Sequence, residues 1–208
     1  AREQLEQALH LAHSHRQPGE KSALGNIEAH SHRNLGIISA LQSDHESSKQ
    51  HFAQSLDLFR EVNDRRGEGG ALNNLGIIHK DLGDFAAAYT YYQASLQLCR
   101  EIGDRWGESV ALNNLGAFDM NQGQLATARV AYEQAVALCQ QIGNSYGETL
   151  SLSCLGVLHH QMGDQARSEA YCRQSLLRAL SSGARAESGF ALTILGHALT
   201  GQQEWVEA

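Results

Sequence analysis

The hexapeptide ALNNLG fills residues 71–76 and recurs, letter for letter, at residues 111–116. Asparagine and glycine are poor helix formers, whereas the alanine and leucine around them favour a helix. When the sequence is shifted against itself by 40 residues, further Leu-Gly pairs come into register. The pairs are Leu35-Gly36, Leu75-Gly76, Leu115-Gly116, Leu155-Gly156 and Leu195-Gly196. Recurrence at one fixed spacing along the chain indicates an internal repeat.

Each repeat has the pattern of two helices joined by a short turn. The first helix is predicted from about residue 64 to residue 82, and its apolar residues are spaced three to four apart, as on one face of an α-helix. They are Leu72, Leu75, Ile78 and Leu82. Gly83 follows as a helix terminator, and Asp84 suits the N-cap of the next helix. The second helix is predicted to end near Gly103. Its apolar face consists of Phe85, Ala88, Tyr92, Leu96 and Cys99.

A helical hairpin of this length cannot cover its own apolar faces, so successive hairpins must stack to form a core. The sequence therefore predicts an all-α fold, a right-handed superhelical solenoid of antiparallel helix pairs with about five repeats. One domain is expected over residues 1–208. Its parts are a partial repeat with an inserted turn at 1–26, full repeats at 27–66, 67–106, 107–146 and 147–186, and a truncated repeat at 187–208. The insertion is expected to lengthen the helix over residues 20–42 by about two turns.

The order Leu-x-x-Leu-Gly, followed by Ala-x-x-x-Tyr in the second helix, resembles the tetratricopeptide repeat over nearly the whole chain. Three features depart from that family. The period is 40 rather than about 34 residues, leucine replaces the usual tryptophan, and the helix-ending proline is absent. The longer period implies a second helix longer by about a turn and a half. This long variant resembles the repeats of the Pins/LGN adaptor, kinesin light chain and bacterial regulatory proteins.

Charge and composition narrow the classes of partner. The chain carries a formal net charge of −7, and no run of lysine or arginine exceeds two residues, so we expect neither nucleic acid nor a membrane surface as a partner. No apolar run approaches the roughly 18 residues of a membrane span. The four cysteines form no C-x-x-C pair and lie at apolar helix positions, which predicts free thiols in a reducing, cytoplasmic setting.

Gly76 and its equivalents need a structural reason, because glycine inside a helix costs about 1 kcal/mol relative to alanine. We expect the missing Cβ to let the first helix of each repeat approach the second closely. These glycines are therefore assigned to the scaffold and not to a binding site.

The asparagines lie on a different side of the first helix from its leucines. Positions 70, 74, 77 and 81 share that side, and with their equivalents in the other repeats we call it the groove face. The first helices of stacked hairpins are expected to line the concave surface. Asn34, Asn74 and Asn114 form a row on the groove face, with Arg33, Asn73 and Asn113 at its shoulder.

A side-chain amide can both donate and accept hydrogen bonds, which suits the backbone of an extended peptide. The family resemblance implies the same role, since the matching asparagines of tetratricopeptide proteins commonly bind ligand backbone. Lys80 and Asn121 complete the predicted peptide-binding groove, and Arg33 and Lys80 are its cations. The alternative is that the asparagines bond only across repeats or to water.

The groove face becomes apolar toward the C-terminus, because the asparagine row ends at Cys154 and Ile194. A ligand's hydrophobic side chains are expected to bind there. The apolar part is formed by Leu150, Val157 and Phe190, with His197 beside them.

No pattern in the sequence predicts metal binding or catalysis. Seven of the eleven histidines lie within the first 51 residues, and His10 and His13 share a helix face, but the spacing dictates no third ligand. His159 and His160 are adjacent and so point to different sides. We find no nucleophile motif, phosphate loop or paired acids, and therefore expect no catalytic residue, metal or cofactor.

Four glutamates recur at the starts of first helices, where a carboxylate interacts favourably with the helix dipole. They are Glu28, Glu68, Glu108 and Glu148. We expect these residues to be structural.

The sequence thus predicts a protein–protein interaction scaffold that holds a peptide segment of a partner in its concave groove. The alternative is a regulatory or sensor segment of a larger bacterial transcriptional or signalling protein. An enzyme is the third and least favoured class. The ends of the chain cut through repeats, which would leave Leu192, Leu195, Leu199 and Trp205 uncovered and favours end-to-end self-association.

Overall fold

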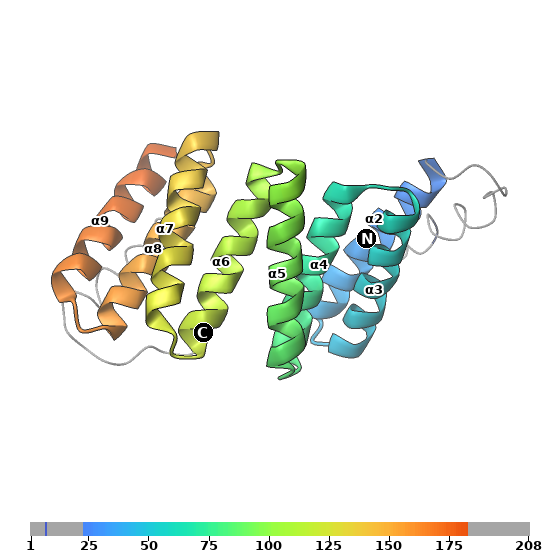
Figure 1. Ribbon diagram of the computed structural model, residues 1–208, viewed down its shortest axis with the longest axis horizontal. Helices are drawn as coiled ribbons and strands as arrows, with labels where there is room; N and C mark the ends of the chain where they lie inside the picture. The colour runs from blue at the N-terminus through green and yellow to red at the C-terminus, as the bar shows by residue number, and fades with distance from the viewer. Residues whose placement is uncertain (1–6, 8–22, 183–208) are drawn as a thin grey trace. The chain divides into compact units, whose positions relative to one another are not determined.

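The computed structural model describes residue 7 and residues 23–182, and within them all regular structure is α-helical (Figure 1). The helices alternate as first and second members of antiparallel pairs, which confirms the predicted fold class. They are α2 (Ala23–Leu41), α3 (His45–Glu61), α4 (Arg65–Asp81), α5 (Phe85–Ile102), α6 (Arg105–Asn121), α7 (Leu125–Ile142), α8 (Ser145–Gln161) and α9 (Gln165–Ser182). The predicted insertion near Pro18 and the C-terminal leucines with Trp205 lie outside the described residues.

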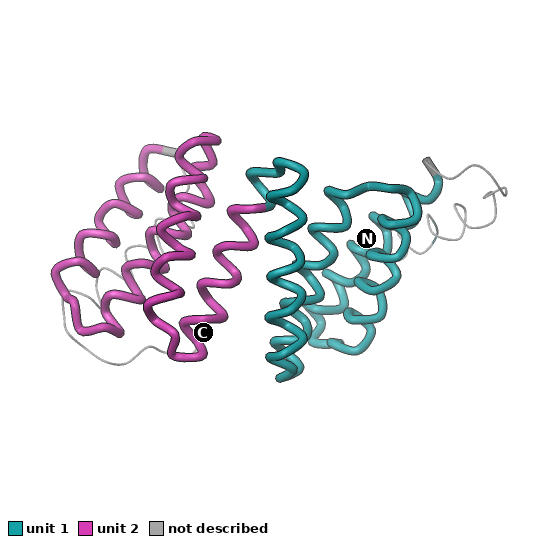
Figure 2. Tube along the Cα trace, in the orientation of Figure 1, with its two compact units in different colours: residues 1–107 teal, residues 108–208 magenta. Residues whose placement is uncertain are grey.

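The chain forms two compact units, residues 1–107 and residues 108–208 (Figure 2). Their boundary falls one residue from the predicted repeat boundary between residues 106 and 107. In unit 1, α2 packs on α3, α3 on α4, and α4 on α5. In unit 2, α7 packs on α8 and α8 on α9. In these contacts, helices of one pair pack on each other and the second helix of a pair packs on the first helix of the next, as the repeat pattern predicts.

The turns follow the predicted chemistry. α4 ends two residues before Gly83, which has a positive φ of +81°. Gly123 and Gly163 occupy the same position in the next two repeats and have φ values of +75° and +76°. This left-handed conformation suits glycine because it has no Cβ. The side chain of Asp84 then accepts a hydrogen bond from the backbone N–H of Ala87 at 3.1 Å and caps α5.

The first described turn departs from this rule, because Ser43 occupies the glycine position with a φ of +60°. The left-handed conformation costs a non-glycine residue about 1–2 kcal/mol in the folded protein, a cost that glycine avoids. Part of this gain is lost, because glycine also makes the unfolded chain more flexible. Ser43→Gly is therefore expected to raise the free energy of unfolding by about 0.5–1 kcal/mol in urea denaturation. Gly83→Ala should lower it by about as much. Equal stability of both variants and the wild type would contradict this account of the turn.

In the four described Leu-Gly pairs, the glycine lies against the second helix of its own repeat, as predicted. A Cβ on Gly76 would lie 2.6 Å from two ring carbons of Tyr92, and one on Gly116 would lie 2.8 Å from Tyr132. In two repeats a hydrogen bond between the paired helices accompanies this approach. Ser48 Oγ on α3 donates to the carbonyl of Gly36 on α2, and Ser168 Oγ on α9 donates to that of Gly156 on α8, both at 2.8 Å.

A second set of glycines lets neighbouring repeats approach each other. A Cβ on Gly67 would overlap the ring of Phe59, and one on Gly147 would lie 2.7 Å from Cys139 Sγ. The recurring glutamates bridge the same junctions. Arg60 Nε donates to Glu68 Oε1 at 2.8 Å, and Gln140 Nε2 donates to Glu148 Oε1 at 2.9 Å. Glu68 and Glu148 thus form hydrogen bonds between repeats, a structural role that the helix dipole alone does not require.

Candidate functional site

Burial separates the two sides of α4 as the sequence predicts. Leu72, Leu75 and Gly76 are buried, whereas the groove-face positions are exposed or half-buried. In α4 the latter are Gly70, Asn74, Ile77 and Asp81. The corresponding positions of α2, α6 and α8 show the same pattern, so the groove face is open to solvent in each unit.

Unit 1 presents the polar part of the groove face. Asn34 on α2 and Asn74 on α4 are half-buried, and neither side chain makes a hydrogen bond within the described part of the chain. Arg33 is half-buried beside Asn34, and its charge helps to lower the pKa of His30, after the larger effect of burial. Lys80 is half-buried and its Nζ lies 3.1 Å from Asp81 Oδ1. Two adjacent repeats thus offer one amide each.

The shoulder asparagines have a different environment. Asn73 and Asn113 are only 8% and 9% exposed. Asn113 Oδ1 accepts a hydrogen bond from Ser151 Oγ at 2.9 Å, which links α6 to α8. One position along a helix turns a side chain by about 100°, so Asn113 faces the neighbouring repeat, and Asn73 is buried at the equivalent position of α4. The bond from Ser151 to Asn113 agrees with the alternative interpretation of the sequence, in which the asparagines bond across repeats.

Unit 2 presents a groove face that is more apolar. Asn114 is half-buried and Asn121 is exposed at the end of α6. On α8, Leu150 is 36% exposed and Val157 is half-buried. Cys154 replaces asparagine there, and burial raises the pKa of its thiol to about 11, so the group is a neutral thiol at pH 7. Phe190 and His197 fall outside the described residues.

Tyr146 extends this apolar surface and was missed at the sequence level. Its side chain is 62% exposed on α8, one helical turn before Leu150. The signal was the spacing of four residues, which places both side chains on one helix face. An exposed aromatic ring at the start of the groove face offers apolar contact area to a ligand.

The adjacent histidines on α8 point to different partners, as predicted. His159 is 1% exposed, stacks on Tyr171 at 5.3 Å and has its Nδ1 3.7 Å from Asp164 Oδ2. Burial is the main cause that lowers the pKa of His159. His160 Nδ1 instead lies 3.1 Å from Gln165 Oε1. Among residues 23–182, no group of three or more histidine, cysteine or acidic side chains could hold a metal ion.

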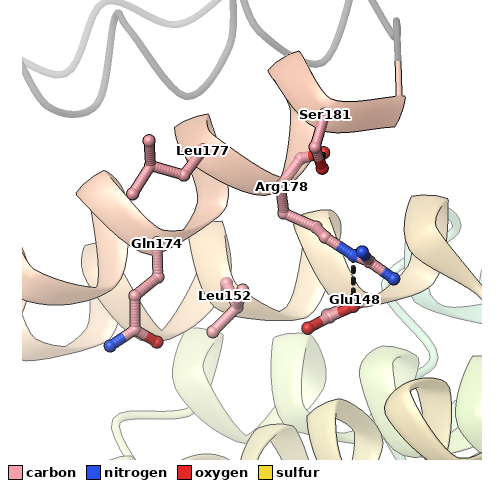
Figure 3. A pocket seen from close by; sticks show the side chains of 6 residues that line it. All are labelled: Glu148, Leu152, Gln174, Leu177, Arg178 and Ser181. Atoms are coloured by element: carbon pink, nitrogen blue, oxygen red, sulfur yellow. Dashed lines mark hydrogen bonds and ion pairs between the residues drawn. The ribbon is translucent and has the colours of Figure 1, made fainter.

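An open depression of about 330 Å³ lies between α8 and α9 in unit 2 (Figure 3). Its lining is Glu148, Leu152, Gln174, Leu177, Arg178 and Ser181. Arg178 Nε lies 2.6 Å from Glu148 Oε2 as an ion pair without an aligned hydrogen bond. The α8 residues of this depression are not groove-face positions. Its charges compensate each other, which argues against a site for a charged ligand.

The chain matches a family of known repeats. A sequence profile described as tetratricopeptide repeat matches residues 27–101, 67–141 and 107–181. The three matches begin at the predicted repeat boundaries. A comparison with curated protein sequences finds no significant match. No helix in the described ranges combines the length and apolarity that crossing a membrane requires.

Several solved structures share the fold at low sequence identity. Aspartyl phosphate phosphatase F from Bacillus subtilis superimposes with a TM-score of 0.79 at 12% identity, over 85% of this chain and 46% of that chain. A Rap protein complexed with competence and sporulation factor gives 0.71 at 12% identity, over 93% and 52%. BtubC from P. vanneervenii gives 0.71 at 14% identity, over 98% and 90%. This chain therefore spans about half the length of the first two proteins.

Proposed function

Because the chain belongs to the tetratricopeptide repeat family, whose domains are typically protein-interaction modules, we propose that it binds an extended segment of another protein on the groove face. The proposed action is recognition without chemistry. Side-chain amides bind the ligand backbone, and apolar groove-face residues bind its side chains. The proposed setting is reducing and cytoplasmic, in keeping with the four free cysteines.

The observation that carries this proposal is the state of Asn34 and Asn74. Each lies at the same position of its repeat, is half-exposed, and makes no hydrogen bond within the described part of the chain. Asparagine within a helix costs some tenths of a kcal/mol relative to better helix formers. A bound backbone that supplies both a donor and an acceptor would satisfy each amide.

The two units offer different chemistry to a ligand. Unit 1 provides the amides, with Arg33 and Lys80 as cations. Unit 2 provides Tyr146, Leu150 and Val157, which suit apolar side chains. We therefore propose that the ligand stretch bound by unit 1 is extended and that the stretch bound by unit 2 carries hydrophobic residues.

The direct test selects binders from a phage-displayed library of random peptides with the full chain, and then measures their Kd. Asn34→Ala/Asn74→Ala removes both free amides. The two amides together can form up to four hydrogen bonds of about 0.5–1 kcal/mol net, so a loss of about 2–4 kcal/mol is expected, which is roughly 30- to 900-fold in Kd. Isothermal titration calorimetry gives this value.

The matched control is Gln54→Ala/Gln93→Ala, which removes two exposed amides from the second helices of the same two repeats. This variant should bind the selected peptides as tightly as the wild type. Equal binding by the asparagine variant, or an equal loss in both variants, would show that the groove-face amides do not hold the peptide.

A second candidate is a regulatory or sensor segment of a larger bacterial protein. The fold of this chain also occurs within chains about twice its length. A helix-turn-helix or nucleotide-binding segment in the adjoining gene sequence would favour this function. The groove face would then bind a segment of the same protein or its regulator.

A further inference from the structure

His32 and His51 meet in unit 1, although neither the repeat pattern nor the groove requires a histidine at either position. His32 belongs to α2 and His51 to α3, and their Nδ1 atoms lie 3.1 Å apart. The ring centroids are 5.3 Å apart with an interplanar angle of 37°. Both side chains are half-buried, so the contact is partly shielded from water.

The repeat register shows that this pair is an exception. The position of His32 holds leucine in the next three repeats, where Leu72, Leu112 and Leu152 are all buried. The position of His51 holds Tyr91, Ala131 and Tyr171. In the second repeat Leu72 belongs to the apolar core, and Tyr91 packs against that core. The fold therefore needs an apolar contact here, and two imidazoles are a departure that stability does not explain.

We propose that His32 and His51 form a two-histidine site for a divalent transition metal ion of the nickel, copper or zinc type. Imidazole is a preferred ligand of these ions. With metal–nitrogen bonds of 2.0–2.1 Å, a separation of 3.1 Å corresponds to an angle of about 100° at the metal, which tetrahedral and square-planar sites both accommodate. Water or a further ligand completes the coordination.

The protonation state of the pair is compatible with this role, because a histidine must be neutral to bind a metal. Burial, and secondly the charge of His51, lower the pKa of His32 to about 4. His32 is thus neutral at pH 7, and protons compete little for its ring. In the absence of metal the two Nδ1 atoms share one proton in a hydrogen bond. A metal bound by both Nδ1 atoms would take the place of that proton, which moves to Nε2 of the same ring, and would link α2 to α3.

The test is isothermal titration of the tag-free full chain with NiCl2 and with ZnCl2 at pH 7. His32→Leu and His51→Tyr introduce the residues that the second repeat carries at these positions, so both variants should fold, which circular dichroism verifies. Loss of one of two ligands is expected to weaken binding by about tenfold or more in each variant. Addition of metal should raise the Tm of the wild type, and addition of EDTA should reverse the rise.

His160→Gln is the matched control, because His160 lies in unit 2, away from the pair, and its Nδ1 lies 3.1 Å from Gln165 Oε1. It should bind metal as the wild type does. Identical isotherms for all four proteins would overturn the proposal, and so would a loss confined to only one of the two pair variants. The readout needs no peptide, so its failure is independent of the groove-face proposal.

Discussion

Gly76→Ala is expected to lower the free energy of unfolding by about 2–3 kcal/mol, although alanine is the better helix former. The added Cβ would lie 2.6 Å from two ring carbons of Tyr92. Tyr92 is 2% exposed, so its ring has no free space to move into. Either the ring leaves its rotamer or α4 moves away from α5. Urea denaturation followed by circular dichroism measures the change.

Gly70→Ala is the matched control within the same helix. A Cβ on Gly70 would have no neighbour within 4 Å, and the residue is exposed. This substitution should therefore raise the free energy of unfolding by up to about 1 kcal/mol, as helix propensity alone predicts. Similar stability changes in the two variants would mean that close approach of α4 and α5 is not why position 76 holds glycine.

Phe59→Ala is expected to cost about 3–5 kcal/mol of unfolding free energy, because the ring is fully buried where α3 meets α4. Gly67→Ala should also destabilise, since its Cβ would overlap that same ring. In the double variant the new methyl group enters the space that the ring has left. The two costs should therefore be non-additive, with a coupling of about 1 kcal/mol or more in favour of the double variant.

The additive reference is Phe59→Ala combined with Gly70→Ala, because Gly70 has no neighbour within 4 Å. Its two effects should sum to within about 0.5 kcal/mol. If Phe59→Ala/Gly67→Ala is just as additive, the two residues do not share one space, and the junction between repeats is held in another way.

Local features were predictable because they depend on residues close in sequence. The predicted helix over about residues 64–82 is α4 (Arg65–Asp81), and the predicted glycine turn and Asp84 cap occur as expected. The close approach at Gly76 was also predictable, since glycine inside a helix otherwise has only a cost. The side of the helix that carries Asn74 followed from the helical period alone.

The site residues were only partly predictable. The sequence put Asn73 and Asn113 at the shoulder of the groove face, and their burial depends on how closely the next repeat packs. The bond from Ser151 to Asn113 joins residues 38 positions apart. Helical periodicity gives the direction of a side chain around its own axis, but it does not give the distance to the neighbouring helix.

By itself the sequence determined the repeat, the helix pairs, their caps and the face on which the amides lie. The reason is that an exact spacing of 40 residues places the same local preferences in each repeat. Only the tertiary structure decided which side chains meet across helices. The contact of His32 with His51 and the pairing of Arg60 with Glu68 are of this kind. Such contacts are set by the separation and rotation of packed helices, which the core side chains determine together.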